Sequence, residues 1–307
     1  MDINPVPSQD KIDAVSRMQR YIAEHIKEPI TQYQLSRAAG YSEYYAARVF
    51  KELTGKTPFE YIRRLRLSQS AIVLRDDKSK VIDVAFDYIF DSHEGFTRAF
   101  SKEFGVTPKE YSNHPKPLKL FMPSNICDFY LLMSNKLEGE KMDKAPSTIF
   151  VQIVDRPARK VIMKRGKTAS NYFEFCEEVG CNIWGILCSI PDALYEPIGM
   201  WMPESLRPEG TSYYTQGVEV ATDWQGEIPE SFEVIELPPC KMLVFQGPPY
   251  DDEKFMQAIS DLWEQTKNYN PEIYGYKWAD SIAPKFQLSP MGYRGYIEGR
   301  PVVEANK

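Results

Sequence analysis

One pattern of eight residues occurs twice in this chain, at a constant offset of fifty positions. The first copy consists of Ser42, Arg48, Phe50, Gly55, Thr57, Pro58, Glu60 and Tyr61, and the second of Ser92, Arg98, Phe100, Gly105, Thr107, Pro108, Glu110 and Tyr111. Serine is a favoured N-cap, glycine ends helices in the left-handed conformation, and proline suits the first turn of the next helix. A stacked repeat array needs three or more units, so two copies indicate a double-headed binding module.

The residues around each copy predict a series of short helices. Apolar residues at helical spacing, capping residues such as Thr31 and Ser42, and glycines such as Gly40 set the expected bounds. The expected helices span 11–26, 31–39, 42–54, 58–74, 81–88, 92–104 and 108–113. A short helix, a tight turn and a second helix form a helix-turn-helix motif, so the sequence predicts two such motifs.

The composition fits two ordinary globular domains. The chain has 307 residues, of which 43% are hydrophobic and 26% charged. The net charge of −6 is uneven, because residues 1–114 hold 17 Lys and Arg against 16 Asp and Glu, whereas the remainder holds 20 against 27. A near-neutral first part can present a basic face to DNA while its acidic residues lie elsewhere.

The sequence predicts neither a membrane segment nor a metal site. No run approaches the ~18 apolar residues of a membrane span, and the N-terminus lacks a basic region followed by an apolar core. The five cysteines include no Cys-x-x-Cys pair, and three histidines leave little material for a metal cluster. We therefore expect a cytoplasmic protein with reduced thiols, without a cofactor, a metal or a membrane partner.

From residue 149 onward the apolar pattern changes to a period of two, which predicts strands. Strands are expected at 149–154, 160–164, 198–202, 213–220, 232–237, 241–246, 285–288 and 293–298, and helices at 169–183 and 251–267. The order strand pair, helix, strand pair occurs twice, which indicates an internal duplication. We predict a multi-domain protein with an all-α domain over 1–114, a linker over 115–147 and an α+β sheet domain over 148–307, with its helices on one face of the sheet.

Residues 10–112 resemble the DNA-binding domain of the AraC/XylS family of transcription regulators. Besides the two copies of the pattern, the resemblance rests on Gly40, Tyr41, Lys51, Arg66, Leu67, Ala71, Ile82, Ala85, Phe90, Phe96, Phe104 and Val106. Two residues depart from the family pattern. Ile89 stands where most of the family has Gly, which puts the geometry of the second turn in question, and Ser112 stands where the family usually has Arg, which removes a phosphate contact.

Residues 149–304 resemble the GyrI-like effector-binding domain. The matching segments are 217–220, 295–298, and Pro301 followed by Val302. DNA binding first and effector binding second is the order of Rob-type bacterial regulators. The resemblance therefore implies a transcription regulator that binds double-stranded operator DNA and a small effector, with RNA polymerase as a further partner.

The buried positions of the second helix in each motif determine which residues face DNA. Ala46, Phe50, Phe96 and Phe100 are among the apolar residues expected to face inward. The outward set predicted to contact DNA is Glu43, Tyr44, Ala47, Arg48 and Lys51 in the first motif, and His93, Glu94, Thr97, Arg98 and Lys102 in the second. A single arginine on a helix face is often only solvated, but recurrence at matched positions favours a function in DNA binding.

Arg48 and Arg98 are the main candidates for base reading, because arginine bonds bidentately to guanine O6 and N7. Arg63, Arg64 and Arg66 suit phosphate contacts or a structural role. Two recognition helices joined by one helix would enter successive major grooves about 34 Å apart. One chain would then read an asymmetric site without dimerising.

Aromatic residues and carboxylates are the candidates for the effector site. Aromatic walls around a desolvated carboxylate bind lipophilic cations through ring quadrupoles and charge pairing. The predicted effector-binding residues are Trp184, Trp201, Tyr214, Glu219, Tyr296 and Glu298. Glu298 is the preferred acid because the resemblance places an acid on the last strand shortly before Pro-Val, although an ungapped match aligns Ile297 with it. Each aromatic residue can instead be part of the core, and each acid an exposed strand residue.

Two other functions remain open for the second part. Some relatives of the GyrI-like domain resemble enzymes that open strained small molecules with a Glu and a Tyr or Trp, so a hydrolase is the alternative to a sensor. No Ser-His-Asp or Cys-His arrangement is present there, since His25, His93 and His114 all lie before residue 115. The other function is a protein-binding module. The leading prediction is a transcription regulator that is not an enzyme.

Overall fold

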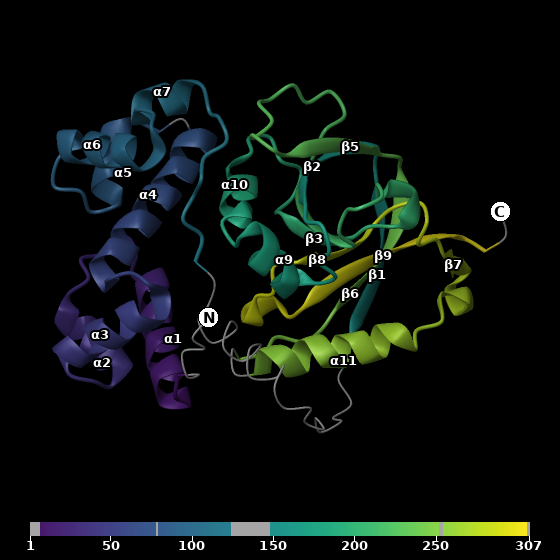
Figure 1. The fold of residues 1–307 in the computed structure, drawn as a ribbon, viewed down its shortest axis with the longest axis horizontal. Coiled ribbons are helices and arrows are strands. Elements are labelled where there is room, and N and C mark those ends of the chain that lie inside the picture. Colours follow the sequence, from purple (N-terminus) through teal and green to yellow (C-terminus); the bar gives the residue numbers. More distant parts are fainter. Residues whose placement is uncertain (1–6, 78, 124–147, 252–253, 306–307) are drawn as a thin grey trace. The chain divides into compact units, whose positions relative to one another are not determined.

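The computed structural model describes residues 7–77, 79–123, 148–251 and 254–305. The chain forms two compact units (Figure 1). The first unit contains the described residues up to Pro115 together with 121–123, and the second contains Lys116–Leu120 and the described residues from 148 onward. Most of the predicted linker lies outside the described residues. No helix in the described part of the chain is both long enough and apolar enough to cross a membrane.

The first unit is entirely helical where it is described. Its helices are α1 (Gln9–Glu24), α2 (Gln32–Ala39), α3 (Glu43–Thr54), α4 (Pro58–Asp76), α5 (Val81–Asp87), α6 (His93–Phe104) and α7 (Pro108–Asn113). The bounds agree with the predicted helices to within about two residues. The predicted double helix-turn-helix fold is therefore confirmed, with α2 and α3 forming the first motif and α5 and α6 the second.

Side-chain caps begin these helices where the sequence predicts them. Ser42 Oγ accepts a hydrogen bond from the Tyr45 N–H at 3.4 Å, and Ser92 Oγ accepts one from the Gly95 N–H at 3.0 Å. Thr31 forms a capping box at the start of α2. The caps satisfy N–H groups that have no partner within the helix.

The ends of the helices follow the repeated pattern as well. Gly55 ends α3 with φ 72° and Gly105 ends α6 with φ 71°, both in the left-handed region that glycine adopts without a steric penalty. Helix α4 then packs against α3 in the first motif and against α5, α6 and α7 in the second (Figure 1). One helix thus joins the two motifs.

The second unit contains a nine-stranded antiparallel sheet. Its strands are β1 (Phe150–Arg156), β2 (Arg159–Arg165), β3 (Ile198–Trp201), β4 (Tyr214–Val220), β5 (Glu233–Leu237), β6 (Cys240–Gln246), β7 (Tyr276–Trp278), β8 (Lys285–Leu288) and β9 (Ile297–Glu304). The strand order is β1-β6-β9-β8-β3-β4-β2-β5, and β7 pairs with β9. This order is palindromic when β1, β2, β3 and β4 are exchanged with β5, β6, β8 and β9, which confirms the predicted duplication.

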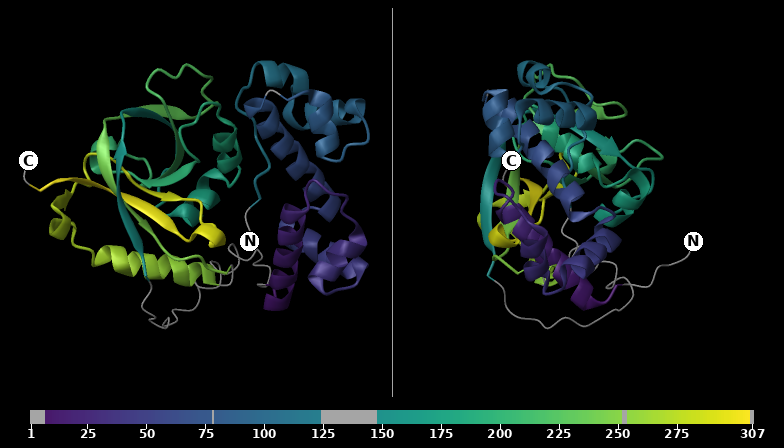
Figure 2. Two further views of the ribbon diagram at one scale, coloured as in Figure 1. Left: turned by 180° about the vertical axis from the view of Figure 1, so that it is seen from behind. Right: turned by 90° about the vertical axis from the view of Figure 1, so that its left-hand side faces the viewer.

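Helices cover one face of this sheet. Helices α9 (Tyr172–Val179) and α10 (Ile183–Ser189) pack on β4, and α11 (Phe255–Lys267) packs on β6 (Figures 1 and 2). The pairing register places both contact regions on the same face. The opposite face forms its own core, in which strand residues such as Met163, Met200, Met242 and Phe286 pack together.

Three predictions in this unit were wrong in detail. The helix expected over 169–183 spans only Tyr172–Val179, because Gly180, with φ 101°, ends α9, and α10 after it was not predicted. The last strand was expected at 293–298 but runs from Ile297 to Glu304, because a 3₁₀ turn and the left-handed Gly295 occupy the preceding residues. Proline is rare inside a sheet, yet Pro301 lies within β9 opposite Met242. The three-residue β7 was missed because it is too short to show a period.

Candidate DNA-binding surface and candidate effector site

The candidate DNA-binding residues lie on the faces of α3 and α6 that point away from the core. Ala46, Val49 and Phe50 are buried on the inner face of α3, and Phe96 and Phe100 on that of α6. On the outer faces Glu43, Tyr44, Arg48, Lys51, Glu94, Arg98 and Lys102 are exposed, whereas Ala47, His93 and Thr97 are half-buried. Tyr44 is 80% exposed, which is unusual for a large aromatic side chain that has only solvent to contact.

Neither of the two matched arginines is in the interior. The Arg48 guanidinium lies 4.9 Å from the centre of the Tyr45 ring, in a cation–π contact on the same helix. Arg98 makes no ion pair or side-chain hydrogen bond with any residue that the structure describes. Both side chains therefore remain available for a ligand outside the chain.

The three arginines of α4 differ in their surroundings. Arg66 donates to the carbonyl oxygens of Ile26 at 2.9 Å and Glu28 at 2.6 Å, and burial lowers its pKa. Arg64 forms an ion pair with Glu103 at 2.7 Å, which links α4 to α6. Only Arg63 is exposed. Arg66 is therefore a structural residue, and Arg63 is the one best placed for phosphate.

Glu298 lies in a row of residues that crosses the helix-covered face of the sheet. In register, Phe245 on β6 is opposite Glu298 on β9, Glu298 is opposite Gln287 on β8, and Gln287 is opposite Gly199 on β3. Directly paired residues of antiparallel strands point to the same side. Glu298 therefore faces α11, and its carboxylate is only 2% exposed. Its neighbour Ile297, which the ungapped match favoured, points to the opposite face because side chains alternate along a strand.

Three side chains satisfy the Glu298 carboxylate. The Trp263 indole N–H donates to Oε2 at 3.0 Å and the Thr266 hydroxyl to Oε1 at 3.3 Å, both from α11. The Lys285 ammonium on β8 lies 3.1 Å from Oε1. A buried carboxylate needs such partners, since an unpaired charge in the interior is costly.

Aromatic residues lie next to these partners of Glu298 along the same face of the sheet. Tyr296 donates to Gln287 Oε1 at 2.9 Å, and Gln287 Nε2 donates to the Tyr214 hydroxyl at 3.3 Å. The Tyr214 ring meets Trp201 edge to face, with centroids 5.3 Å apart. Burial raises the pKa of Tyr214 and of Tyr296 well above the usual value of 10. We call the set Trp201, Tyr214, Trp263, Thr266, Lys285, Gln287, Tyr296 and Glu298 the Glu298 cluster.

The structure does not bring all the predicted effector-binding residues together. Glu219 is buried on the opposite face of the sheet, where its carboxylate pairs with Arg156 and, at 2.7 Å, with Arg159. Trp184 is half-buried on α10, and none of the described contacts joins it to Glu298. Trp201, Tyr214, Tyr296 and Glu298 do belong to one cluster.

Sequence reasoning missed four members of the cluster, namely Trp263, Thr266, Lys285 and Gln287. A partial signal was present, because Lys285 and Gln287 share one face of a predicted strand, and Trp263 and Thr266 are three residues apart on a predicted helix. The sequence does not show which strand pairs with β9, and that pairing brings these side chains to Glu298.

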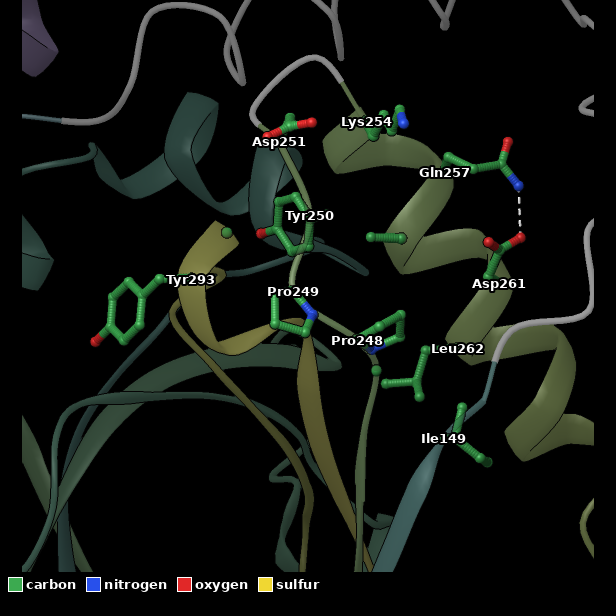
Figure 3. Close-up of a pocket in the computed structure, with 13 residues that line it drawn as sticks. Ile149, Pro248, Pro249, Tyr250, Asp251, Lys254, Gln257, Asp261, Leu262 and Tyr293 are labelled. Atoms are coloured by element: carbon green, nitrogen blue, oxygen red, sulfur yellow. Dashed lines mark hydrogen bonds between the residues drawn. The ribbon is translucent and has the colours of Figure 1, made fainter.

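A cavity of about 530 Å³ lies between α11 and the loop after β6 (Figure 3). Its lining includes Pro248, Pro249 and Tyr250 from the loop after β6, and Lys254, Gln257 and Asp261 from α11. The N–H of Gly247, in the lining, donates to the Tyr296 carbonyl at 2.9 Å, but no side chain of the Glu298 cluster is among the lining residues. Glu298 itself is not part of the lining.

Comparison with known proteins identifies relatives of the first unit and of part of the second. A helix-turn-helix domain family matches residues 35–114. The transcriptional regulator Rob of Salmonella typhimurium is 30% identical over 181 residues, which cover 57% of this chain and 58% of that protein. The regulatory protein SoxS of Salmonella typhimurium is 37% identical over 91 residues, which cover 30% of this chain and 85% of SoxS.

Among solved structures, the DNA-binding domain of the global transcriptional factor AdpA in complex with a target DNA matches with a TM-score of 0.32 at 25% identity, covering 33% of this chain and 91% of that one. The match to Rob spans less than two thirds of Rob. The match to SoxS covers most of that protein at more than 30% identity. This chain belongs to the AraC family of helix-turn-helix, DNA-binding transcription regulators.

Proposed function

We propose that this protein is a transcription regulator that reads one asymmetric DNA site through α3 and α6 and binds a small lipophilic effector, cationic or aromatic, at the Glu298 cluster. Family membership supports the DNA-binding half. The observation that carries the effector half is the Glu298 carboxylate, 2% exposed, which accepts from the Trp263 indole and pairs with a lysine that lies over the Trp201 ring. RNA polymerase as a further partner stays a prediction.

For DNA reading, the two recognition helices expose arginine at matched positions. Arg48 and Arg98 stand fifty residues apart, each in the second turn of its helix. Each is surrounded by a different set of exposed residues, with Tyr44 and Lys51 beside Arg48, and Glu94 beside Arg98. Different side chains read different bases, so the two half-sites should differ in sequence.

The DNA-binding proposal is tested on a site first selected from random duplexes with the wild-type protein. Arg48→Ala and Arg98→Ala should each weaken binding about 10- to 100-fold, which corresponds to about 1–3 kcal/mol for a bidentate arginine–guanine contact. Lys109→Ala, an exposed cation on α7, is the control and should change affinity less than threefold. The proposal fails if both arginine variants bind as the control does in gel-shift titrations at one salt concentration.

For effector binding, the chemistry of the Glu298 cluster suits a cation with an aromatic body. A desolvated carboxylate attracts positive charge strongly, and the faces of Trp201 and Trp263 can hold the cation through their ring quadrupoles.

The geometry favours a sensor over a hydrolase. General acid–base catalysis works best with a pKa near the operating pH. Burial raises the pKa of Tyr296 and Tyr214 well above 10, which makes both phenols poor proton donors near neutral pH. Glu298 already accepts from Trp263 and Thr266 and pairs with Lys285. These contacts suit a fixed binding charge better than a proton carrier.

The effector proposal is tested by calorimetric titration of the full chain with tetraphenylphosphonium, a lipophilic cation. Binding should be lost or weakened at least about tenfold in Glu298→Gln. The control is Glu236→Gln, because Glu236 is an exposed acid of the same sheet on β5. Equal binding to the wild-type protein and to Glu298→Gln would refute the site. Turnover of candidate compounds that is abolished in Glu298→Gln would support the hydrolase instead.

A further inference from the structure

Lys285 makes the contacts with Glu298 and Trp201 that a cationic effector would need. Its ammonium lies 3.1 Å from Glu298 Oε1 and 4.9 Å from the centre of the Trp201 ring. The cation thus has a buried carboxylate as one neighbour and an aromatic face as another. A cationic effector at this site would need the same two neighbours.

The fold fixes this arrangement. Lys285 and Trp201 are directly opposite residues of β8 and β3, and Gln287, two residues along from Lys285, is opposite Glu298 on β9. Lys285, Trp201 and Glu298 therefore point to the same face of the sheet. The lysine lies between the other two because of strand register.

The burial of the two charged partners is unequal. Glu298 has a side chain that is 2% exposed, whereas that of Lys285 is 32% exposed. The carboxylate is fixed by Trp263 and Thr266 as well as by the lysine. Lysine has a flexible four-carbon stem and its ammonium is well hydrated, so Lys285 can move to solvent where Glu298 cannot.

We propose, on the basis of the effector site proposed above, that Lys285 is an internal competitor that sets the ligand specificity of the Glu298 cluster. A cationic ligand must displace the ammonium from both Glu298 and Trp201 before it can pair with them. With Lys285 in place the pair carries no net charge, so a monocation gains little attraction until that displacement occurs. Neutral aromatic ligands do not compete for the carboxylate and are insensitive to Lys285.

The test compares tetraphenylphosphonium with the neutral triphenylphosphine oxide by calorimetric titration of the full chain. Lys285→Met removes the charge and keeps the length of the side chain. This change should tighten tetraphenylphosphonium binding about tenfold and alter triphenylphosphine oxide binding less than about twofold. Lys285→Arg retains the charge, so its affinity for the cation should stay within about threefold of the wild-type value.

Lys241→Met is a matched control in the same sheet. Lys241 pairs with Asp155 at 2.7 Å and its side chain is 33% exposed, close to the 32% of Lys285, but Asp155 is 80% exposed. Removing this lysine changes the net charge of the protein equally and should leave the affinity for both ligands unchanged. Circular dichroism melting curves show whether each variant is folded.

A double variant tests whether the effect of Lys285→Met acts through Glu298. In the Glu298→Gln background, Lys285→Met should no longer tighten cation binding, because the carboxylate for which Lys285 and the cation compete is gone. Competition by Lys285 is refuted if the wild-type protein binds the cation and Lys285→Met binds it equally or more weakly. If neither the wild-type protein nor Lys285→Met binds the cation, the effector site itself is wrong, and the competition proposal falls with it.

Discussion

Ile89 holds in the second helix-turn-helix motif the left-handed backbone position that Gly40 holds in the first. Their φ angles are 59° and 74°. An L-residue with a side chain pays about 1–2 kcal/mol for this conformation, because its Cβ approaches the following carbonyl oxygen. Glycine has no Cβ and adopts this conformation without that steric cost.

The two turns close with the same hydrogen bond. The Tyr41 N–H donates to the Ser36 carbonyl at 3.1 Å, and the Phe90 N–H donates to the Ala85 carbonyl at 3.0 Å. This is the six-residue bond of the Schellman motif. The departure of Ile89 from the family pattern is therefore accommodated as local strain and does not change the turn.

Replacement of Ile89 by glycine should stabilise the first unit. We expect Ile89→Gly to raise the free energy of unfolding by about 1 kcal/mol, since relief of backbone strain exceeds the entropy that glycine adds to the unfolded chain. The measurement is thermal unfolding followed by circular dichroism, with hydrogen exchange of the α5 and α6 amides to separate this unit from the other.

Gly40→Ala is the reciprocal change and should lower the free energy of unfolding by about 1–2 kcal/mol. A Cβ at Gly40 would meet only Arg17 Nη2 at an ordinary 3.8 Å, so the cost is that of the backbone. A loss of stability in Ile89→Gly would mean that the half-buried isoleucine side chain contributes more than its strained backbone costs.

Glu219 should matter for stability and not for ligand binding. Its carboxylate pairs with both Arg156 and Arg159, which are 8% and 3% exposed. Burial and the nearby Arg159 lower the pKa of Arg156, so the two guanidinium groups depend on this acid. Removing one partner of such a buried set costs about 3–5 kcal/mol.

We therefore expect Glu219→Gln to destabilise the second unit by about 3 kcal/mol in urea unfolding, and to bind tetraphenylphosphonium with unchanged affinity at a temperature where it is folded. The exposed Glu236→Gln serves again as the control, with an effect within about 0.5 kcal/mol. An unaltered stability combined with lost cation binding would instead place Glu219 in the effector site.

Local signals predicted the helices well and the sheet domain less completely. Caps such as Ser42 and Ser92 and stops such as Gly55 and Gly105 act within a few residues, so the sequence shows them directly. The last strand was misplaced because proline normally ends a strand, whereas Pro301 continues β9. Which strands pair depends on contacts between distant segments, and no single strand carries that information.

The candidate sites, too, were predicted where local signals suffice and missed where strand pairing decides. The outward faces of α3 and α6 could be predicted because helical period alone separates Arg48 from Phe50. Glu298 was predicted from a resemblance, but its partners were not. Strand register decides that Lys285 and Gln287 reach it while Glu219 lies on the other face, and register was not visible in the residue pattern.

Gly199 should be required for the position of the Tyr214 hydroxyl. A Cβ at Gly199 would overlap Tyr214 Oη and press on Gln287 Cγ. We expect Gly199→Ala to lower the free energy of unfolding by about 1–3 kcal/mol, as overpacked cores do. It should also weaken tetraphenylphosphonium binding, because the Tyr214 ring would shift from Trp201.

Tyr214→Phe removes the overlapping oxygen and should therefore partly rescue Gly199→Ala, although the ring carbon Cζ still lies 2.8 Å from the Cβ position. In a double-mutant cycle the combined variant should be more stable than the sum of the two single changes predicts. Additive losses would show that Gly199 is needed for a reason other than room for the hydroxyl.

The Cys181 thiol should react with alkylating reagents at a lower pH than an ordinary cysteine does. It is exposed, and its hydrogen bond with Cys176 on α9 lowers the pKa of Cys181 to about 7. The thiolate is the reactive form, so alkylation by iodoacetamide should rise with pH and reach half its maximal rate near pH 7. Peptide mapping by mass spectrometry follows this cysteine separately from the others.

Cys176→Ala removes the hydrogen bond and should return the midpoint of Cys181 alkylation to about pH 8.5, the ordinary value for cysteine. At pH 7 the rate should then fall about threefold, because the loss of thiolate is partly offset by the greater nucleophilicity of a more basic thiol. The Cys240 peptide provides the internal reference, since Cys240 contacts Arg159 and is remote in sequence from this pair. An unchanged midpoint in Cys176→Ala would show that the neighbouring thiol does not control the acidity of Cys181.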